Sequence, residues 1–248
     1  MSFQMPDFLP ALPEIFVLTM ACVVLLVEAW LKPRTATYLL ALGTLLGSAA
    51  ITVFTGTLDP AYTFNGMFID DVMGDMLKLM ADLAAIVAII YSRKYLADRD
   101  MLRGEYFALV LFAVLGMMVM ISASHFLTLY LGVELLALSL YAMVALQRDS
   151  ARATEAAMKY FILGALASGL LLYGMSLLYG LSGSLELAKV ARAVHESARD
   201  DMVMVFGLVF LVAGLGFKLG AAPFHMWVPD VYHGAPTAVT LFIGSAPK

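Results

Sequence analysis

Four lysines lie within apolar stretches of the chain, where an ammonium group is costly to keep. They are Lys78, Lys159, Lys218 and Lys248, and no arginine lies in the middle of such a stretch. Arginine keeps its proton in proteins, whereas a lysine in apolar surroundings can release it, and a nearby carboxylate favours the charged form again. A lysine whose distance from a carboxylate changes is therefore a proton-binding site of variable affinity.

The matching carboxylate is Glu134, in the stretch FLTLYLGVELLALSLYAMVAL, with no other Asp, Glu, Lys or Arg within a dozen positions. A charge at the middle of a bilayer costs at least about 2.5–3.5 kcal/mol. Glu134 therefore needs a partner on another helix, or it must stay protonated. We expect it to pair with Lys218 in a proton relay. The alternative is a polar contact that only holds helices together.

Lys218 stands in the stretch LVAGLGFKLGAAPFHMWVPD, between Gly216 and Gly220 and shortly before Pro223. Proline has no N–H, so the carbonyl of Leu219 is expected to lose its helical partner. Irregular backbone at membrane depth is tolerated only inside protein or beside water. The stretch therefore predicts a broken helix with an ammonium at the break, suited to proton transfer. An ordinary proline kink with a structural ion pair is the alternative.

The other three lysines have less specific surroundings. Lys248 lies in the last apolar stretch, where a snorkelling terminal lysine is the alternative. Lys159 stands near the start of its stretch and is equally consistent with snorkelling to water. Lys78 has Asp75 three residues before it and Asp82 four residues after it, which predicts an ion-pair cluster on one helix face.

The elements that carry these residues are apolar segments long enough to cross a membrane. Of the 248 residues 62% are hydrophobic and only 14% are charged, against about 25% charged in soluble domains. A spanning helix needs about 20 mainly apolar residues. We therefore predict an all-α polytopic membrane protein of about eight transmembrane helices, with a discontinuous seventh helix and an eighth that begins near Pro236. The first seven predicted spans cover residues 9–31, 37–55, 72–91, 105–123, 126–146, 154–179 and 202–232.

The positive residues of the loops predict the orientation. One set of loops carries eight lysines and arginines and the opposite set three, Lys189, Arg192 and Arg199. Positive loops stay inside, so we expect the N-terminus on the outer, periplasmic side. Residues 184–198 have apolar side chains at helical spacing, which predicts an amphipathic helix at the outer surface. No lysine or arginine precedes the first span, which is therefore expected to be a true helix rather than a secretory signal.

Composition argues against several classes of site. The single cysteine, Cys22, and the four scattered histidines lack metal-ligand spacing. The glycines of GLGFKLG are spaced wrongly for a dinucleotide loop, and the basic residues form no patch for nucleic acid. We expect this chain to bind no metal, NAD, flavin, iron–sulfur cluster or nucleic acid.

The stretch GFKLGAAPFHMWVPDVYHGAPTAVTLFIGSAPK, residues 216–248, resembles the proton-translocating, antiporter-like membrane subunits of respiratory complex I, the NADH–quinone oxidoreductase. The resemblance implies a fold of about fourteen transmembrane helices with two inverted five-helix repeats, each a half-channel with a discontinuous helix. It places the family's key glutamate on Glu134. The family's lysines of the sixth, seventh and eighth helices fall on Lys159, Lys218 and Lys248.

By this resemblance residues 1–104 are the three leading helices, and residues 105–248 are the first half-channel repeat, which stops inside its last helix. Family members run about twice as long, so the chain is expected to be a fragment or a truncated product. The resemblance implies a multi-pass subunit of a bacterial inner-membrane translocase, among other membrane-arm subunits. NADH, FMN, iron–sulfur clusters and quinone are expected on partner subunits. A secondary cation/proton antiporter subunit and a non-pumping membrane scaffold are the alternatives.

Overall fold

The computed structural model describes residues 6–31, 34–198 and 201–247, and in these residues the chain is almost wholly helical. A short hairpin of strands β1 (Ala61–Thr63) and β2 (Phe68–Asp70) pairs antiparallel, with Tyr62 opposite Ile69. A 3-10 turn, Leu9–Ala11, leads into the first helix. The helices are α1 (Leu12–Leu31), α2 (Arg34–Thr55), α3 (Val72–Asp98), α4 (Gly104–Ile121), α5 (Phe126–Val144), α6 (Ala151–Ser182), α7 (Leu187–Glu196), α8 (Met202–Leu219), α9 (Val228–Gly234) and α10 (Thr237–Ser245).

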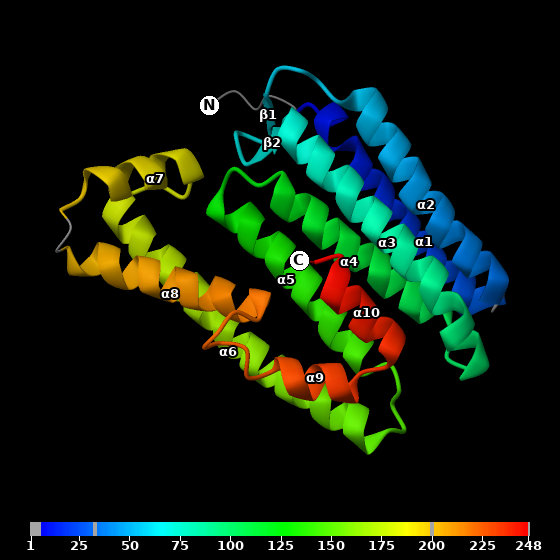
Figure 1. Cartoon of the computed structure of the whole chain (residues 1–248). Coiled ribbons are helices and arrows are strands. Elements are labelled where there is room, and N and C mark those ends of the chain that lie inside the picture. Colours follow the sequence, from blue (N-terminus) through cyan, green and yellow to red (C-terminus); the bar gives the residue numbers. More distant parts are fainter. Residues whose placement is uncertain (1–5, 32–33, 199–200, 248) are drawn as a thin grey trace.

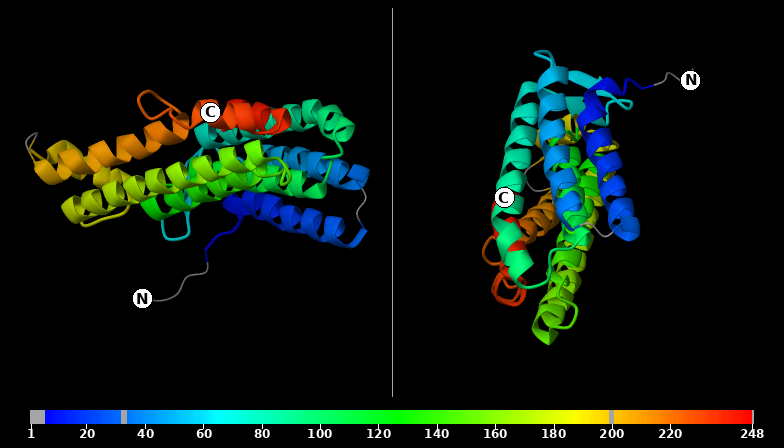
Figure 2. Two further views of the ribbon diagram at one scale, coloured as in Figure 1. Left: turned by 90° about the horizontal axis from the view of Figure 1, so that it is seen from below. Right: turned by 90° about the vertical axis from the view of Figure 1, so that its right-hand side faces the viewer.

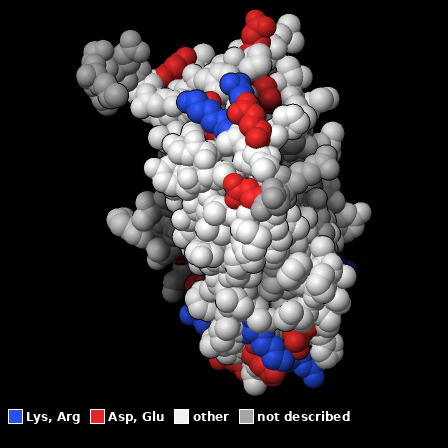
Figure 3. Space-filling model, turned by 90° about the vertical axis from the view of Figure 1, so that its left-hand side faces the viewer, with Lys and Arg blue, Asp and Glu red and all other residues white. Residues whose placement is uncertain are grey.

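Six segments are long and apolar enough to cross a membrane: residues 9–30 and 35–55, α4, α5, α6 and α8. Helix α3 is long enough, but its apolar run is interrupted by Asp75, Lys78 and Asp82. Helix α10 has only nine residues. Figure 3 shows a broad belt without charged side chains between two charged ends of the molecule. A polytopic helical membrane protein is therefore confirmed, whereas the structure does not fix a count of eight spans.

The helices form a bundle in which α1, α2, α3 and α4 pack on one side and α6 and α8 on the other, with α5 between them (Figure 1). Two further views show the long helices running roughly side by side and the C-terminal α10 lying beside α3 (Figure 2). The strands and α7 lie at one end of the bundle, and the turns from α3 to α4 and from α5 to α6 lie at the other.

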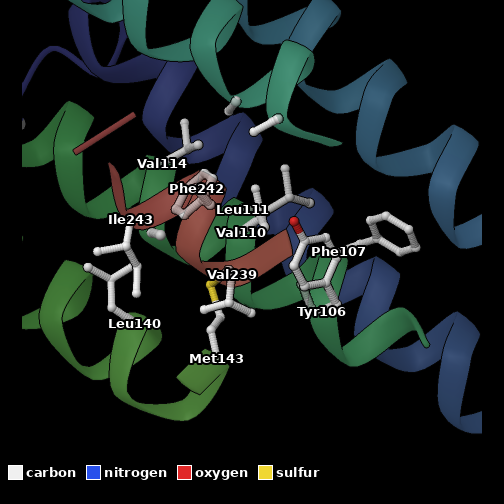
Figure 4. Close-up of a cluster of buried hydrophobic side chains, with 14 of the residues drawn as sticks. Tyr106, Phe107, Val110, Leu111, Val114, Leu140, Met143, Val239, Phe242 and Ile243 are labelled. Atoms are coloured by element: carbon white, nitrogen blue, oxygen red, sulfur yellow. The ribbon is translucent and has the colours of Figure 1, made fainter. Parts of the chain in front are cut away.

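Helix α4 is the centre of the apolar core, because most of its residues are buried. Figure 4 shows Val239, Phe242 and Ile243 of α10 packed against α4 and α5. These three side chains are at most 3% exposed. Although it is short, α10 is therefore anchored in the core.

The predicted break of the seventh span is confirmed, but its cause differs from the expected one. Helix α8 ends at Leu219, before Pro223 is reached, because Gly220 adopts a left-handed conformation with φ of +68°. The N–H of Gly220 donates to the carbonyl of Phe217, and the N–H of Ala221 donates to that of Gly216 at 2.8 Å. This is a glycine C-terminal cap that satisfies the last carbonyls. The break is thus set by Gly220 rather than by loss of a hydrogen bond at the proline.

The predicted amphipathic helix is confirmed as α7, which follows Glu186 and buries Val190. The N–H of Phe126, at the start of α5, donates to the carbonyl of Leu185 at 2.9 Å, and the N–H of Leu187 donates to the carbonyl of Ser124 at 3.0 Å. These bonds fix α7 across the same end of the bundle as the β-hairpin.

Candidate functional site

Three polar side chains from three helices meet inside the apolar belt. The ammonium of Lys218 on α8 lies 2.9 Å from Ser168 Oγ on α6 and 3.3 Å from Glu134 Oε1 on α5. The hydroxyl of Ser168 donates a hydrogen bond to the same carboxylate oxygen. The structure therefore brings together Glu134 and Lys218, which lie 84 residues apart, as the isolation of each charge predicted.

The contact between Lys218 and Glu134 is largely shielded from water. The side chain of Lys218 is 17% exposed and that of Glu134 is 23% exposed. Hydrogen bonds to charged groups contribute about 1.5–3 kcal/mol each, and removal from water strengthens them. Lys218 is also the last-turn cation of α8, where the helix dipole favours positive charge.

Aromatic side chains lie near the ammonium and after the break. The Lys218 Nζ lies 6.0 Å from the ring centroid of Tyr141. The indole of Trp227, which follows the break, donates to the carbonyl of Phe217 at 2.8 Å and stacks on Tyr160 with 4.5 Å between ring centroids. Trp227 thus ties the segment after the break back to α8 and α6.

Close backbone contacts hold α5 against α4 and α8 against α6. A Cβ atom added at Gly116 of α4 would lie 2.6 Å from the backbone nitrogen of Leu136 in α5, and one at Gly174 of α6 would lie 2.7 Å from that of Leu211 in α8. Small residues at such crossings let membrane helices approach closely. This packing positions Ser168 and Lys218 within hydrogen-bond distance.

A cavity of about 170 Å³ opens beside the ammonium. Its lining includes Lys218, Tyr160, Leu140 and, at the end of the chain, Pro247. Its lining is mainly apolar, and Lys218 and Tyr160 are the lining residues with polar side-chain groups. The cavity therefore joins Lys218 to the residue that precedes Lys248. Lys248 itself lies outside the described residues, so its position is not part of the site described here.

Lys159 binds neither Glu134 nor the ammonium site. Its Nζ lies 2.9 Å from Glu155 Oε1 on the same helix and 3.0 Å from Asp230 Oδ1 on α9. The contact with Asp230 joins α6 to the short helix after the break. The sequence does not identify Asp230 as a site residue, because acidic residues are common near helix starts. Its partner Lys159 is also 71 residues away.

The predicted cluster of Lys78 with Asp75 and Asp82 is wrong in its partners. Lys78 pairs with Glu14 of α1 at 2.9 Å and with Asp70 of β2 at 3.5 Å. Spacing along one helix does not show which face is turned to a neighbouring helix, and Lys78 faces the bundle interior, where its side chain is fully buried.

Ser168 is the site residue that sequence reasoning missed. Serines are frequent at contacts between membrane helices, so a serine in an apolar helix gives no specific signal. Its role follows only from its place between the carboxylate and the ammonium.

We expect Ser168→Ala to weaken the site without dismantling it. Lys218 would lose one of its two polar partners, while the direct contact with Glu134 remains. Loss of one hydrogen bond to a charged group, worth about 1.5–3 kcal/mol, should lower a proton-translocation rate that depends on this site by about tenfold or more. The control is Ser176→Ala, which removes an exposed hydroxyl from the same helix. Equal rates for the two variants would exclude Ser168 from the site's chemistry.

Comparison with known proteins agrees with this geometry. Residues 123–248 match the profile of the family described as NADH:quinone oxidoreductase/Mrp antiporter, TM. The chain is 58% identical, over its whole length and 52% of the relative, to NADH-quinone oxidoreductase subunit N of Nitrosomonas europaea. It is 60% identical, over 98% of its length and 51% of the relative, to the protein of that name from Methylovorus glucosotrophus. The chain thus spans about half the length of the curated relatives it matches.

Solved structures share the fold. A chain of respiratory complex I from Thermus thermophilus with bound aureothin superposes with a TM-score of 0.79 at 33% identity, covering 95% of this chain and 50% of that one. A chain of the Mrp complex from Dietzia superposes with a TM-score of 0.77 at 19% identity, covering 95% of this chain and 46% of that one, which shows likeness of fold alone. The family profile covers the residues that carry Glu134 and Lys218, and the curated relatives match along the whole chain. The chain therefore belongs to the NADH:quinone oxidoreductase/Mrp antiporter transmembrane family.

Proposed function

We propose that the chain is part of a proton-translocating membrane subunit of an NADH–quinone oxidoreductase in a bacterial inner membrane. The observation that carries this proposal is the contact of Lys218 with Ser168 and Glu134 inside an apolar belt. Family membership supports it, together with high identity to relatives named as subunit N of that enzyme.

In the proposed mechanism the Glu134–Lys218 pair opens and closes. When it is closed, the carboxylate and the hydroxyl of Ser168 stabilise the protonated ammonium. When it opens, the apolar surroundings favour the neutral amine, and the proton passes through the cavity beside Lys218 toward Lys248. Lys159, held by Asp230, would supply or accept protons on the side where α9 lies.

The energies are of the right size. Moving one charge across the membrane costs about 2.3 kcal/mol per 100 mV, or about 3.5 kcal/mol against roughly 150 mV. Making or breaking the two contacts of the Lys218 ammonium changes its free energy by about 3–6 kcal/mol, at about 1.5–3 kcal/mol each. The pair is therefore strong enough to gate one proton and weak enough to open.

In this proposal residues 1–104 form the leading helices and residues 105–248 form the first half-channel. Together they make up eight spans of a fourteen-helix family fold, and the N-terminus lies outside. The N-terminal end of α1 lies at the end of the bundle with the β-hairpin, opposite the turns after α3 and α5 that carry Arg99, Arg103 and Arg148. The positive-inside tendency supports that orientation. Other membrane-arm subunits would be its partners, and they and their neighbours would bind NADH, FMN, iron–sulfur clusters and quinone.

The test replaces Glu134 with glutamine in the membrane complex that contains this chain. Glutamine keeps the shape but removes the charge that holds the ammonium, so we expect proton translocation driven by NADH and quinone to fall by at least tenfold, about 1.4 kcal/mol of barrier. The matched control is Glu196→Gln on α7, where the side chain is exposed. Proton translocation by the Glu134→Gln complex at the control rate, in sealed vesicles with a pH-sensitive dye, would refute the relay and leave the scaffold function.

A second candidate, a secondary cation/proton antiporter subunit, is favoured by the family profile, which includes Mrp antiporters. The same vesicles separate the two functions. Cation-driven proton movement without NADH and quinone would support the antiporter, and its absence alongside redox-driven pumping would support the oxidoreductase subunit.

A further inference from the structure

A second group of buried charges lies among the leading helices, on elements other than those that carry Glu134 and Lys218. The Nζ of Lys78 on α3 is 2.9 Å from Glu14 of α1 and 3.5 Å from Asp70 of β2. The side chain of Lys78 is fully buried, and those of Glu14 and Asp70 are 6% and 3% exposed. Three separate elements thus direct ionisable groups to one point in the interior.

Asp82 belongs to the same group. It stands one helical turn after Lys78, on the same buried face of α3, and it is fully buried. Glu14 and Lys78 lie close enough to act on it electrostatically. Ser48 of α2 lies beside the carboxyl group, yet neither carboxyl oxygen of Asp82 has a hydrogen-bond partner of good geometry among the described residues. The same holds for the Glu14 oxygens and the Lys78 ammonium, but these two groups form an ion pair with each other at 2.9 Å.

The charges of this group do not balance. The group has three carboxyl groups, Glu14, Asp70 and Asp82, and one ammonium, Lys78. If every group were ionised the interior would carry two uncompensated negative charges, which low-dielectric surroundings oppose strongly. Lys78 already contacts Glu14 and Asp70, so Asp82 is the carboxyl group without an ion-pair partner among the described residues. One proton on Asp82 reduces the imbalance from two negative charges to one, which Glu14 and Asp70 share around the ammonium.

A proton compensates this charge better than a metal ion does. The ammonium of Lys78 already occupies the position between two carboxylates that a cation would take. Within residues 6–31, 34–198 and 201–247 no group of three or more His, Cys, Asp or Glu side chains is arranged to hold a metal. A protonated carboxyl group is uncharged, so burial opposes it much less than it opposes a carboxylate.

We propose that Glu14, Asp70, Lys78 and Asp82 form a second proton-binding site, distinct from the Glu134–Lys218 pair, and that the proton is held by Asp82. The ion pairs of Lys78 with Glu14 and Asp70 form the charged part of the site. Asp82 is the neutral part, a carboxylic acid at neutral pH.

Asp75 gives the site a connection to water. It is in the first turn of α3, partly exposed, and it lies beside Asp70. Seven residues of helix separate Asp75 from Asp82, a rise of about 10 Å. Asp75, Asp70 and Lys78 therefore form a polar line from the end of the bundle that carries the β-hairpin to the buried acid.

Infrared spectroscopy of the intact membrane complex tests the proposal, because a protonated carboxyl group absorbs apart from a carboxylate. In Asp82→Asn we expect loss of one protonated-carboxyl band that is present in the parent complex and shifts in deuterated water. The control is Asp98→Asn, the same change on the same helix at an exposed position, which should leave the band in place. An unchanged band in an assembled Asp82→Asn complex would overturn the proposal.

Asp82→Glu keeps a carboxylic acid at the same place and serves if Asp82→Asn fails to assemble: the protonated-carboxyl band should shift in position, and an unchanged band would overturn the proposal. Lys78→Met tests the charged part of the site. Without the ammonium, Glu14 and Asp70 lose their counter-charge and should take up protons, so protonated-carboxyl absorption should increase over that of the parent. No increase would overturn the ion pairs of Lys78 as the charged part of the site. Both signals report proton occupancy rather than pumping, so they are independent of the function proposed for Glu134 and Lys218.

Discussion

Replacing Lys218 with arginine is expected to abolish proton translocation while the ion pair with Glu134 stays in place. Arginine carries its charge on a group that does not release its proton in proteins. Its reference pKa lies about two to three units above that of lysine, which makes release at least about a hundredfold less favourable. The cavity of about 170 Å³ beside Lys218 gives room for the larger guanidinium.

This substitution separates proton transfer from structural support. If the pair only holds α5, α6 and α8 together, arginine should serve as well as lysine, and pumping at the parent rate would contradict the relay. Lys218→Met is the complementary change. It removes the ammonium from the partly buried Glu134, which then keeps only the Ser168 hydroxyl as a partner. Removing one member of a buried pair costs about 3–5 kcal/mol, so we expect it to lower assembly as well as pumping.

The measurements are the amount of assembled complex and the protons moved per NADH oxidised, in sealed vesicles. Lys189→Arg is the control, because the exposed Lys189 of α7 pairs at 2.7 Å with the partly exposed Glu186, which precedes that helix. It should match the parent in both quantities. Lys218→Arg should match it in assembly only.

The second large effect is expected at the crossing of α6 and α8. A Cβ atom at Gly174 would lie 2.7 Å from the backbone nitrogen of Leu211 and 2.8 Å from the carbonyl oxygen of Gly207. Backbone atoms cannot move aside as the end of a side chain can, so Gly174→Ala should push α8 away from α6. Forced overpacking costs about 1–3 kcal/mol, and the displacement should also separate Lys218 from Ser168.

Gly180→Ala provides a matched control on the same helix, because nothing lies within 4 Å of the added Cβ atom. Alanine is a better helix former than glycine by about 1 kcal/mol, so this variant should be as stable as the parent or slightly more stable. Opposite shifts in the thermal unfolding temperature of the two purified variants would support the crossing as the element that positions the site. A Gly174→Ala protein with parental stability and pumping would contradict it.

Hydropathy located the helices well because a lipid-facing helix and a buried one are both apolar, so length and composition suffice. The sequence spans of α1, α5 and α8 begin or end within a few residues of the structural bounds. Glu134 and Lys218 were identifiable for the same reason, since an isolated charge in a long apolar run stands out. The C-terminal cap at Gly220 was less evident, because the neighbouring proline suggested a break of its own.

Partners across helices could not be predicted from spacing. Lys78 has two aspartates at helical spacing on its own helix, yet it binds Glu14 and Asp70 on other elements. Side chains on one helix face share a direction but meet only if their lengths and rotamers allow it, and a neighbouring helix can offer a nearer charge. The same limitation applies to Lys159, whose partner Asp230 follows the break.

The sequence by itself determined that this protein is a bundle of membrane helices with a few charged side chains in apolar stretches. The reason is that the bilayer core destabilises every polar group that has no hydrogen-bond partner. Only the tertiary structure decided which charges meet. Ser168 between Glu134 and Lys218, and Asp82 beside the Lys78 ion pairs, depend on how helices cross. Those crossings follow from close packing between residues distant along the chain, such as Gly174 against Leu211, and no local pattern records them.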